Sequence, residues 1–502
     1  MTTRPPTRWL PRWPKWLPRF GRAAGMDVAA AGASTSVVPI ADAPTPAVPK
    51  IHLTGVSTPM TSLSDRLHAE PGPEREQFIV NAFADNFGAA MAADPAAWRG
   101  KFRKMAATPF AFYRGSAALF YADMAHDEEP FVDEKTSRVW IQGDLHAENF
   151  GTYMNSQGII VFDVNDFDEA YVAPFTWDLK RLAASLTLIG YEKAMSDDEI
   201  RQMIAMTVRS YVDQVHKFAS GTETADFALT LDNTTGALKE LLQESRLLTR
   251  VGLLDKLTGI VDYDRRFTMN KVQHPIDDAT KAKVEAAFHQ YLDTIPQRKR
   301  FGQVSYNLKD ICQTRGIGIG SAGLEVYTLL VEGPTQSLEN DILISMKQAL
   351  TAAPSRAVAD QNIHGYFLHD GHRTVLSQRA LQAYADPWLG HTTLDGQGRL
   401  VAEISPYTND LSWGDLNSLD EILELLGYMG RAVAKIHCVS DDDSDHTLVP
   451  FSIEEAIATG LAGREDAFVE AMIDFGHAYG DIVRDDYRLF VDAFRNHQFP
   501  GL

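Results

Sequence analysis

A strand–loop–strand–helix pattern between residues 138 and 189 constrains the fold most strongly. The apolar run Arg138–Ile141 predicts one strand, and residues 158–164 (GIIVFDV) predict the next. Between them lies the polar loop IQGDLHAENFG, residues 141–151. Farther on, Asp178–Ile189 carries apolar residues at helical spacing, with Thr176 as the expected N-cap. Two interpretations fit the loop: a catalytic loop held between strands, or an acidic surface hairpin.

The acidic and amide side chains of this region favour the catalytic interpretation. Asp144 and Asn149 form a D-x-x-x-x-N pattern. In such a loop the aspartate can accept a proton from a hydroxyl while the asparagine oxygen binds Mg²⁺. The second strand then ends in Asp163, Asp166 and Asp168. These carboxylates offer the hard oxygen ligands that Mg²⁺ prefers.

Charge and composition exclude some classes of protein. The 502 residues carry a net charge of −20, and residues 1–25 hold six basic and no acidic residues. An acidic body is unsuited to general nucleic-acid binding, so we expect no nucleic-acid partner. No apolar stretch is long enough to span a bilayer, and we expect no integral membrane association. Two cysteines cannot form a disulfide framework, which favours a cytoplasmic location.

Composition divides the chain into four parts. Residues 1–61 are basic, then rich in proline and alanine, and predict a disordered tail. We expect folded structure from near Ser62, with a helical lobe over 62–300 that includes helices throughout 196–300. A β-containing lobe is expected over 301–416. Residues 417–502 predict C-terminal helices packed on the catalytic lobe, the first with a capping box of Ser418 and Glu421.

A glycine-rich segment, GIGIGSAG, opens the β-containing lobe. Its candidate nucleotide-binding residues are Gly318, Gly320, Ser321 and Gly323. A dinucleotide-binding turn would need a helix after Gly323, but LEVYTLLV favours a strand. The next strand, DILISMK, ends on Lys347, so the two strands predict an antiparallel sheet with a lysine that reaches nucleotide phosphates. A flexible glycine hairpin with a solvated lysine is the alternative.

Several segments together resemble a known family. GDLHAENFG, NDFDEA, DLKRLAAS, FAFYRG, GIGSAG, SQRALQA and GRAVAKIH closely resemble recurring segments of the uncharacterised bacterial domain-of-unknown-function family 2252, over roughly residues 62–500. The loop is more distantly similar to that of the protein-kinase-like aminoglycoside and choline phosphotransferases. This resemblance implies Asp144 as catalytic base, Asn149 as metal ligand and Asp178 as an anchor of the loop. Asp166 is favoured over Asp163 as the main metal ligand, because Phe167 and the interval to Asp178 resemble the usual pattern.

The order of the parts departs from the kinase pattern. Kinases place the glycine loop and lysine before the catalytic loop, whereas Gly318 and Lys347 follow it here. The helix that usually leads into the catalytic loop resembles Glu421–His437, near the C-terminus. We therefore expect a circularly permuted, helix-rich, two-lobed α+β fold of kinase-like type. In such a fold Lys347 should lie within about 10 Å of Asp166, across a cleft.

Other positions leave the activity open. Gln142 stands where the phosphotransferases usually have histidine, and Glu325 replaces an apolar residue. No glutamate stands between Thr351 and Gln382 to pair with Lys347, so either Gln378 or Asp360 substitutes for it, or the lysine is unpaired.

Two further residues of the region have supporting parts in this interpretation. His146 is expected to orient the loop by a hydrogen bond, since no second histidine stands at zinc spacing. Arg114 fits either a contact to phosphate or substrate, or a structural ion pair.

The sequence thus predicts an enzyme that uses ATP and Mg²⁺ to phosphorylate a hydroxyl of a small molecule. Two alternatives stay open: transfer of AMP on the same fold, and an inactive nucleotide-binding regulatory module. The acceptor and any protein partner are not specified by the sequence.

Overall fold

The computed structural model describes residues 72–125, 127–222, 224, 227–302, 305–315, 323–382, 384–441 and 448–502. All of them belong to one compact unit, Pro49–Leu502. The predicted tail 1–61, the start of folding at Ser62, and Gly318, Gly320 and Ser321 lie outside the described residues.

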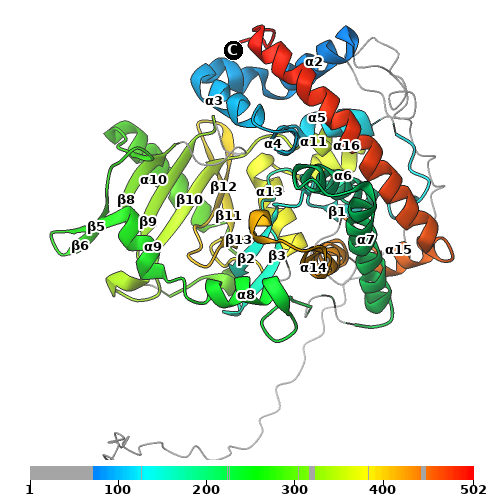
Figure 1. Ribbon diagram of the computed structural model, residues 1–502. Helices are drawn as coiled ribbons and strands as arrows, with labels where there is room; N and C mark the ends of the chain where they lie inside the picture. Colours follow the sequence, from blue (N-terminus) through cyan, green and yellow to red (C-terminus); the bar gives the residue numbers. More distant parts are fainter. Residues whose placement is uncertain are drawn as a thin grey trace, which may run out of the picture. The chain divides into compact units, whose positions relative to one another are not determined.

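The fold is α+β, and about half of it is helix. The longer helices are α2 (Pro73–Ala93), α3 (Pro95–Met105), α6 (Thr176–Glu192), α7 (Asp197–Ala219), α10 (Asp278–Leu292), α13 (Asp370–Leu381), α14 (Leu419–Cys438) and α16 (Glu465–Arg495). The shorter ones are α4 (Pro109–Arg114), α5 (Ala117–Met124), α8 (Gly236–Ser245), α9 (Arg250–Leu257), α11 (Ala353–Ala357), α12 (Gln361–Tyr366) and α15 (Ile453–Leu461). Figure 1 shows the largest sheet on one side and α6, α7, α14 and α16 gathered on the other.

Two small antiparallel sheets hold the polar loop. One pairs β1 (Val139–Ile141) with β4 (Tyr171–Ala173), and the other has the order β13-β2-β3. Its strands are β2 (Phe150–Met154), β3 (Ile160–Val164) and β13 (Asn409–Asp410). The two predicted strands are therefore confirmed as β1 and β3.

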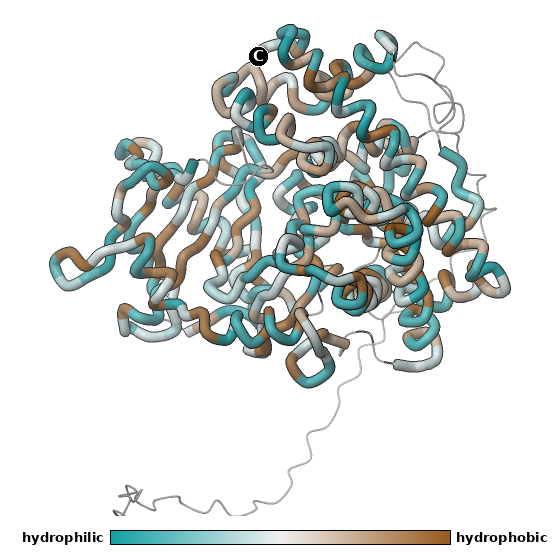
Figure 2. Tube along the Cα trace, viewed as in Figure 1, coloured by the Kyte–Doolittle hydropathy of each residue, from teal (hydrophilic) through white to brown (hydrophobic). Residues whose placement is uncertain are grey.

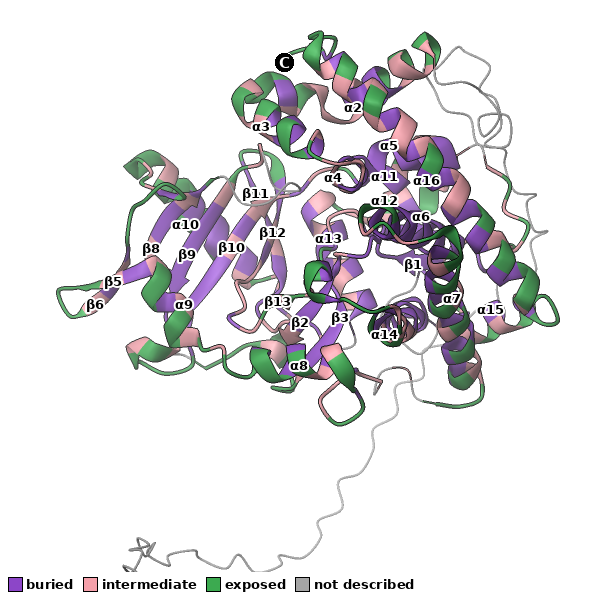
Figure 3. Ribbon diagram, in the orientation of Figure 1, coloured by how far each residue is buried: buried purple, intermediate pink, exposed green. Residues whose placement is uncertain are grey.

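Helix α6 follows these sheets and is buried on nearly every side (Figure 3). The predicted helix at Asp178–Ile189 is confirmed, but the predicted N-cap is wrong. Thr176 is the first helical residue, and Phe175 precedes it as the N-cap without a capping side chain. The Thr176 hydroxyl instead donates to the Glu129 carboxylate at 2.7 Å, because a tertiary partner replaces the local one.

The largest sheet has six antiparallel strands in the order β11-β12-β10-β9-β8-β7. They are β7 (Gln273–His274), β8 (Leu308–Thr314), β9 (Val326–Val331), β10 (Ile342–Gln348), β11 (Gly390–Leu394) and β12 (Gln397–Glu403). A strand, β9, follows Gly323, as predicted, and it pairs with β10 so that Lys347 lies opposite Val326. Apolar residues along these strands and α10 form their shared core (Figure 2).

The prediction of helices throughout residues 196–300 is wrong in part. β5 (Thr258–Val261) and β6 (Asp264–Phe267) form a hairpin, and β7 is the edge strand of the large sheet. Ile260 and Val261 are exposed on this hairpin. A strand of four residues is too short for hydrophobic periodicity to distinguish it from a helix.

The C-terminal helices return to the polar loop. Helix α14 begins with the predicted capping box, since Ser418 accepts the Glu421 N–H and Glu421 accepts the Ser418 N–H. Its predicted apolar stripe, from Ile422 to Ile436, is buried against α7, and the helix also contacts β1 and β3. None of the described helices is long and apolar enough to cross a membrane.

Candidate active site

Asp144 is held by a buried arginine that the sequence reasoning did not single out. Arg181, fully buried on α6, donates through Nε to Asp144 Oδ1 at 2.8 Å and forms an ion pair with the same oxygen. Burial raises the pKa of Asp144 to about 7, although Arg181 opposes the shift. Arg181 binds Oδ1, whereas the second carboxylate oxygen, Oδ2, lies 3.9 Å from His146 Nε2. A carboxylate with this pKa can accept a proton near neutral pH.

The backbone that precedes Asp144 is fixed by Asp178. The Gln142 and Gly143 N–H groups donate to the two oxygens of the Asp178 carboxylate, at 2.7 and 2.9 Å. His437, at the end of α14, lies 3.3 Å from the same carboxylate and 2.9 Å from the Tyr211 hydroxyl. Three segments distant in the sequence therefore hold the start of the polar loop.

Two side chains fix the rest of the loop. The Asn149 amide nitrogen donates to the Asp144 carbonyl at 2.8 Å, which leaves the amide oxygen as its free acceptor. His146 Nδ1 accepts the Glu148 N–H at 3.2 Å, and burial lowers the pKa of this histidine. A neutral His146 is thus an internal hydrogen-bond acceptor of the loop.

Asp166 lies in an acidic turn, residues 165–169, beside the loop. Its φ of 55° is in the left-handed region that few non-glycine residues adopt. Burial and then the neighbouring Asp168 raise the pKa of Asp166. Such crowding of carboxylates is relieved when a cation binds.

The loop and the acidic turn are joined directly. The Gln142 side chain accepts the Asp144 N–H at 2.8 Å and donates to the carbonyl oxygens of Asn165, at 3.1 Å, and Asp166. Gly143 has φ 82°, and a Cβ on it would overlap the Glu169 carbonyl. The glutamine at this unusual position therefore links the candidate base to the candidate metal ligand.

Lys347 reaches the acidic turn from the large sheet. Its ammonium forms an ion pair with Asp168. Burial lowers the pKa of Lys347, but Asp168 and Asp166 more than reverse this effect and raise it. The predicted substitutes for a glutamate are wrong: Gln378 donates to Gln382 at 3.2 Å, and Asp360 pairs with Arg138.

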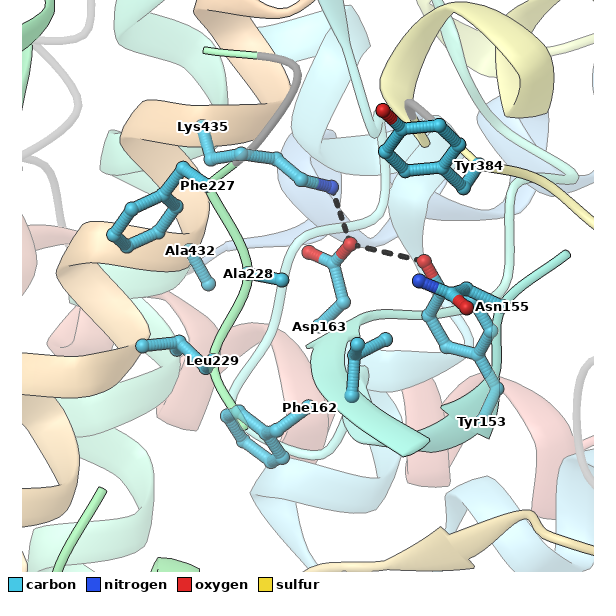
Figure 4. A pocket seen from close by; sticks show the side chains of 11 residues that line it. Tyr153, Asn155, Phe162, Asp163, Phe227, Ala228, Leu229, Tyr384, Ala432 and Lys435 are labelled. Carbon is cyan, nitrogen blue, oxygen red and sulfur yellow. Dashed lines mark hydrogen bonds and ion pairs between the residues drawn. The ribbon is translucent and has the colours of Figure 1, made fainter. Parts of the chain in front are cut away.

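Asp163, the second candidate for a metal ligand, is engaged elsewhere. Its carboxylate pairs with Lys435 of α14, and the Tyr153 hydroxyl donates to it at 3.3 Å (Figure 4). Both charged side chains are more than nine-tenths buried. Asp163 lines a separate hollow with Lys435, whereas Asp166 lines the hollow that contains Lys347, so Asp163 does not join Asp166.

Two hollows meet at the acidic turn. A cleft of about 540 Å³ is lined by Asp166 and Asp168 on one wall and by Lys347 and Gln378 on the other. Lys347 and the acidic residues thus share one cleft, although they are separated by about 180 positions.

A small cavity of about 60 Å³ lies against Asp144, Asp166 and Asp168. Lys101 and Arg114 also line it. Lys101 was missed by the sequence reasoning because nothing near it resembles a motif. Arg114 forms an ion pair with Glu148, which gives that loop residue a partner. Gly323, the described end of the glycine segment, packs against the indole of Trp98.

The oxygen atoms of Asp166 and Asn149 are the candidate ligands for a metal ion. Among the described residues, no three His, Cys, Asp or Glu side chains form a preassembled metal cage. Mg²⁺ does not need one, since one or two protein oxygens plus phosphate oxygens commonly suffice. Asp166 and the free oxygen of Asn149 fit that smaller requirement.

Comparison with known proteins gives one match. A family model described as "Uncharacterized protein conserved in bacteria (DUF2252)" matches residues 93–493. The chain belongs to this family. Neither the search of curated proteins nor that of solved structures gave a match. The family match spans α3 through most of α16, so every residue of the site lies within it.

Proposed function

We propose that this chain is an ATP-dependent, Mg²⁺-dependent phosphotransferase with a circularly permuted, kinase-like arrangement. The single observation that carries the proposal is the meeting of Lys347 with the acidic turn beside Asp144. A surface hairpin has no reason to gather a strand lysine and a crowded carboxylate from distant segments in one cleft, with a candidate base on the adjoining cavity. Phosphoryl transfer needs such a set, because its catalysis is mostly positioning and charge stabilisation.

Each residue of the set has a defined task. Asp144 Oδ2 accepts the proton of the acceptor hydroxyl, while Arg181 fixes the carboxylate through Oδ1. Lys347 leaves Asp168 for the phosphates of ATP when the nucleotide enters the cleft. Asp178 and Gln142 hold the loop so that the base and the acidic turn keep their spacing.

Asp166 and Asn149 are the residues that would hold Mg²⁺. When bound, the ion would neutralise phosphate charge and orient the transferred group. The raised pKa of Asp166 supports this assignment, because a carboxylate crowded by Asp168 gains most from a cation. Asp163 has no part in this role, since Lys435 already satisfies it.

The experiment that tests the proposal compares the wild type with Asp144→Asn. We expect both proteins to bind Mg²⁺–AMPPNP in calorimetry, and only the wild type to phosphorylate acceptors in an untargeted metabolite screen. Asp395→Asn is the matched control, because Asp395 lies on an exposed turn with φ 50° that asparagine tolerates.

The label of the nucleotide distinguishes the alternatives. Transfer of label from γ-labelled ATP supports phosphotransfer, whereas transfer from α-labelled ATP would show AMP transfer instead. Nucleotide binding without any turnover would favour the regulatory module. Equal turnover in wild type and Asp144→Asn would reject Asp144 as the base.

A further inference from the structure

The small cavity next to Asp144 is lined by two cationic side chains that have no role in the proposed phosphoryl transfer. Lys101, from α3, and Arg114, from the last turn of α4, line it together with Asp144 and Asp166. Both cations come from helices that precede the polar loop in sequence. The cavity of about 60 Å³ has room for roughly four to six waters. That is space for one small head-group and not for a nucleotide.

Lys101 is a buried cation that has no ion-pair partner among the described residues. It is 5% exposed, and none of the described residues forms a hydrogen bond or ion pair with its ammonium. Its ammonium lies 4.6 Å from the Trp98 ring centroid and 5.1 Å from that of Phe87. Aromatic faces attract a cation, but they do not replace the water that an ammonium loses on burial. Burial lowers the pKa of Lys101 to about 8, because the buried ammonium has lost its water.

Four carboxylates line the cavity, and three of them have a partner other than Lys101, whereas Asp166 lies beside Asp168. Asp144 pairs with Arg181, and Asp168 pairs with Lys347. Glu169 accepts the Ala353 N–H at 2.6 Å. The charges of Glu169, Asp144 and Asp168 favour the ammonium of Lys101 from a distance, but none of the three forms an ion pair or a hydrogen bond with it.

Arg114 has unused donor capacity on the same cavity. Its Nη1 pairs with the partly exposed Glu148, while its Nε is buried and has no hydrogen-bond partner among the described residues. A buried donor left unsatisfied costs free energy. A buried ammonium and a partly exposed guanidinium with a buried, unpaired Nε line one small cavity, and together they predict an anion between them.

We propose that Lys101 and Arg114 bind an anionic group of the acceptor, a carboxylate or a phosphate. This inference rests on the proposed function and names its substrate class: a small hydroxyl compound that carries a negative charge close to the reacting hydroxyl. With its anionic group in the small cavity, the acceptor presents its hydroxyl to Asp144, which lines the same cavity. The nucleotide then occupies the larger cleft on the other side of the acidic turn.

The test uses inorganic phosphate as the probe and calorimetry as the measurement. Phosphate is titrated into the full-length wild type, Lys101→Met and Arg114→Met, each saturated beforehand with Mg²⁺–AMPPNP so that the larger cleft is filled. We expect phosphate to bind the wild type, and to bind both variants about tenfold or more weakly, since each loses a charge-assisted hydrogen bond. Lys104→Met, an exposed lysine on the same helix, is the matched control and should bind like the wild type.

The results distinguish an anionic group of the acceptor from the phosphates of the nucleotide. If Mg²⁺–AMPPNP prevents phosphate binding, or if Lys101→Met weakens AMPPNP as strongly as phosphate, the cations belong to the nucleotide and the proposal is overturned. Unchanged phosphate binding in both variants, with wild-type thermal unfolding midpoints, also overturns it. If AMPPNP fails to bind the wild type, the proposed function fails, while phosphate binding still reports on Lys101 and Arg114. Arg114→Met keeps the test decisive if Lys101→Met does not fold.

Discussion

Two lysine–aspartate pairs, one on β3 and one in the acidic turn that follows it, differ in their surroundings. Asp163 pairs with Lys435 in a site where both side chains are about 5% exposed. Asp168 pairs with Lys347 where the side chains are 26% and 19% exposed, on the wall of the cleft. The chemical groups are the same. Burial alone separates a pair that holds the fold from one that can exchange its partner.

The energetic reason is the cost of removing charge from water. A fully buried pair has lost its hydration, so neither partner can leave without stranding the other. A partly exposed pair contributes little to stability, since water and salt compensate for its separation. This difference fits a structural role for Asp163–Lys435 and the phosphate-binding role proposed above for Lys347.

The largest expected effect is on the buried pair. Lys435→Met should lower the free energy of unfolding by about 3–5 kcal/mol, because Asp163 is left charged in an apolar site. Urea unfolding measures this change. The double variant Asp163→Leu/Lys435→Met should recover most of the loss, since no buried charge remains. A loss below about 1 kcal/mol for the single variant would remove the contrast between the two pairs.

Lys347→Met tests the other pair and should affect turnover instead of folding. We expect phosphoryl transfer to fall about 100- to 1000-fold, as when one charge-stabilising donor is removed from an active site. The free energy of unfolding should change by less than about 1 kcal/mol. Parallel measurement of both quantities decides the assignment, and a large loss of stability with intact turnover would reverse it.

Asp166→Asn tests whether Asp166, in contrast to the structural Asp163, is a metal ligand. Because burial and Asp168 raise the pKa of Asp166 above its unfolded value, its charged form costs stability at neutral pH. The neutral asparagine should therefore leave the unfolding free energy unchanged or slightly higher. The Mg²⁺ concentration needed for half-maximal activity should rise about tenfold or more. An unchanged Mg²⁺ requirement would argue against Asp166 as a ligand.

The smallest effect is a pH dependence. Asp144 must be ionised to accept a proton, and its pKa is raised to about 7. The value of kcat/KM should fall about tenfold for each pH unit below about 7, and level off above it. In Asp144→Asn the residual activity should lack this limb. A pH profile that is flat between pH 5 and 8 in the wild type would show that another group limits the reaction.

The sequence predicted the elements that depend on local pattern. Short-range periodicity and turn chemistry predicted strands β1 and β3, the pair β9 and β10, and helix α14 with its capping box. The backbone hydrogen bonds to Asp178 agree with the anchor implied by the family resemblance. These features need no knowledge of distant partners.

The choice of partners could not be predicted, because it is decided by tertiary packing. Nothing around Asp163 indicates that Lys435, 272 positions away, returns on α14 to pair with it. Arg181 stands only three residues after Asp178, but its role depends on how α6 lies beneath the loop. Lys101 carries no motif at all, and only burial without an ion-pair partner among the described residues distinguishes it from an ordinary helix lysine.

The contact between Gly143 and the Glu169 carbonyl has a consequence for the whole site. A hydrogen atom at this position permits the two chain segments to touch, and any larger side chain would force them apart. The separation of the proton acceptor from the acidic turn is thus a property of the main chain. Substitution of the polar side chains can alter which molecule is bound, whereas the distance between Asp144 and the acidic turn is set by the contact of Gly143 with Glu169.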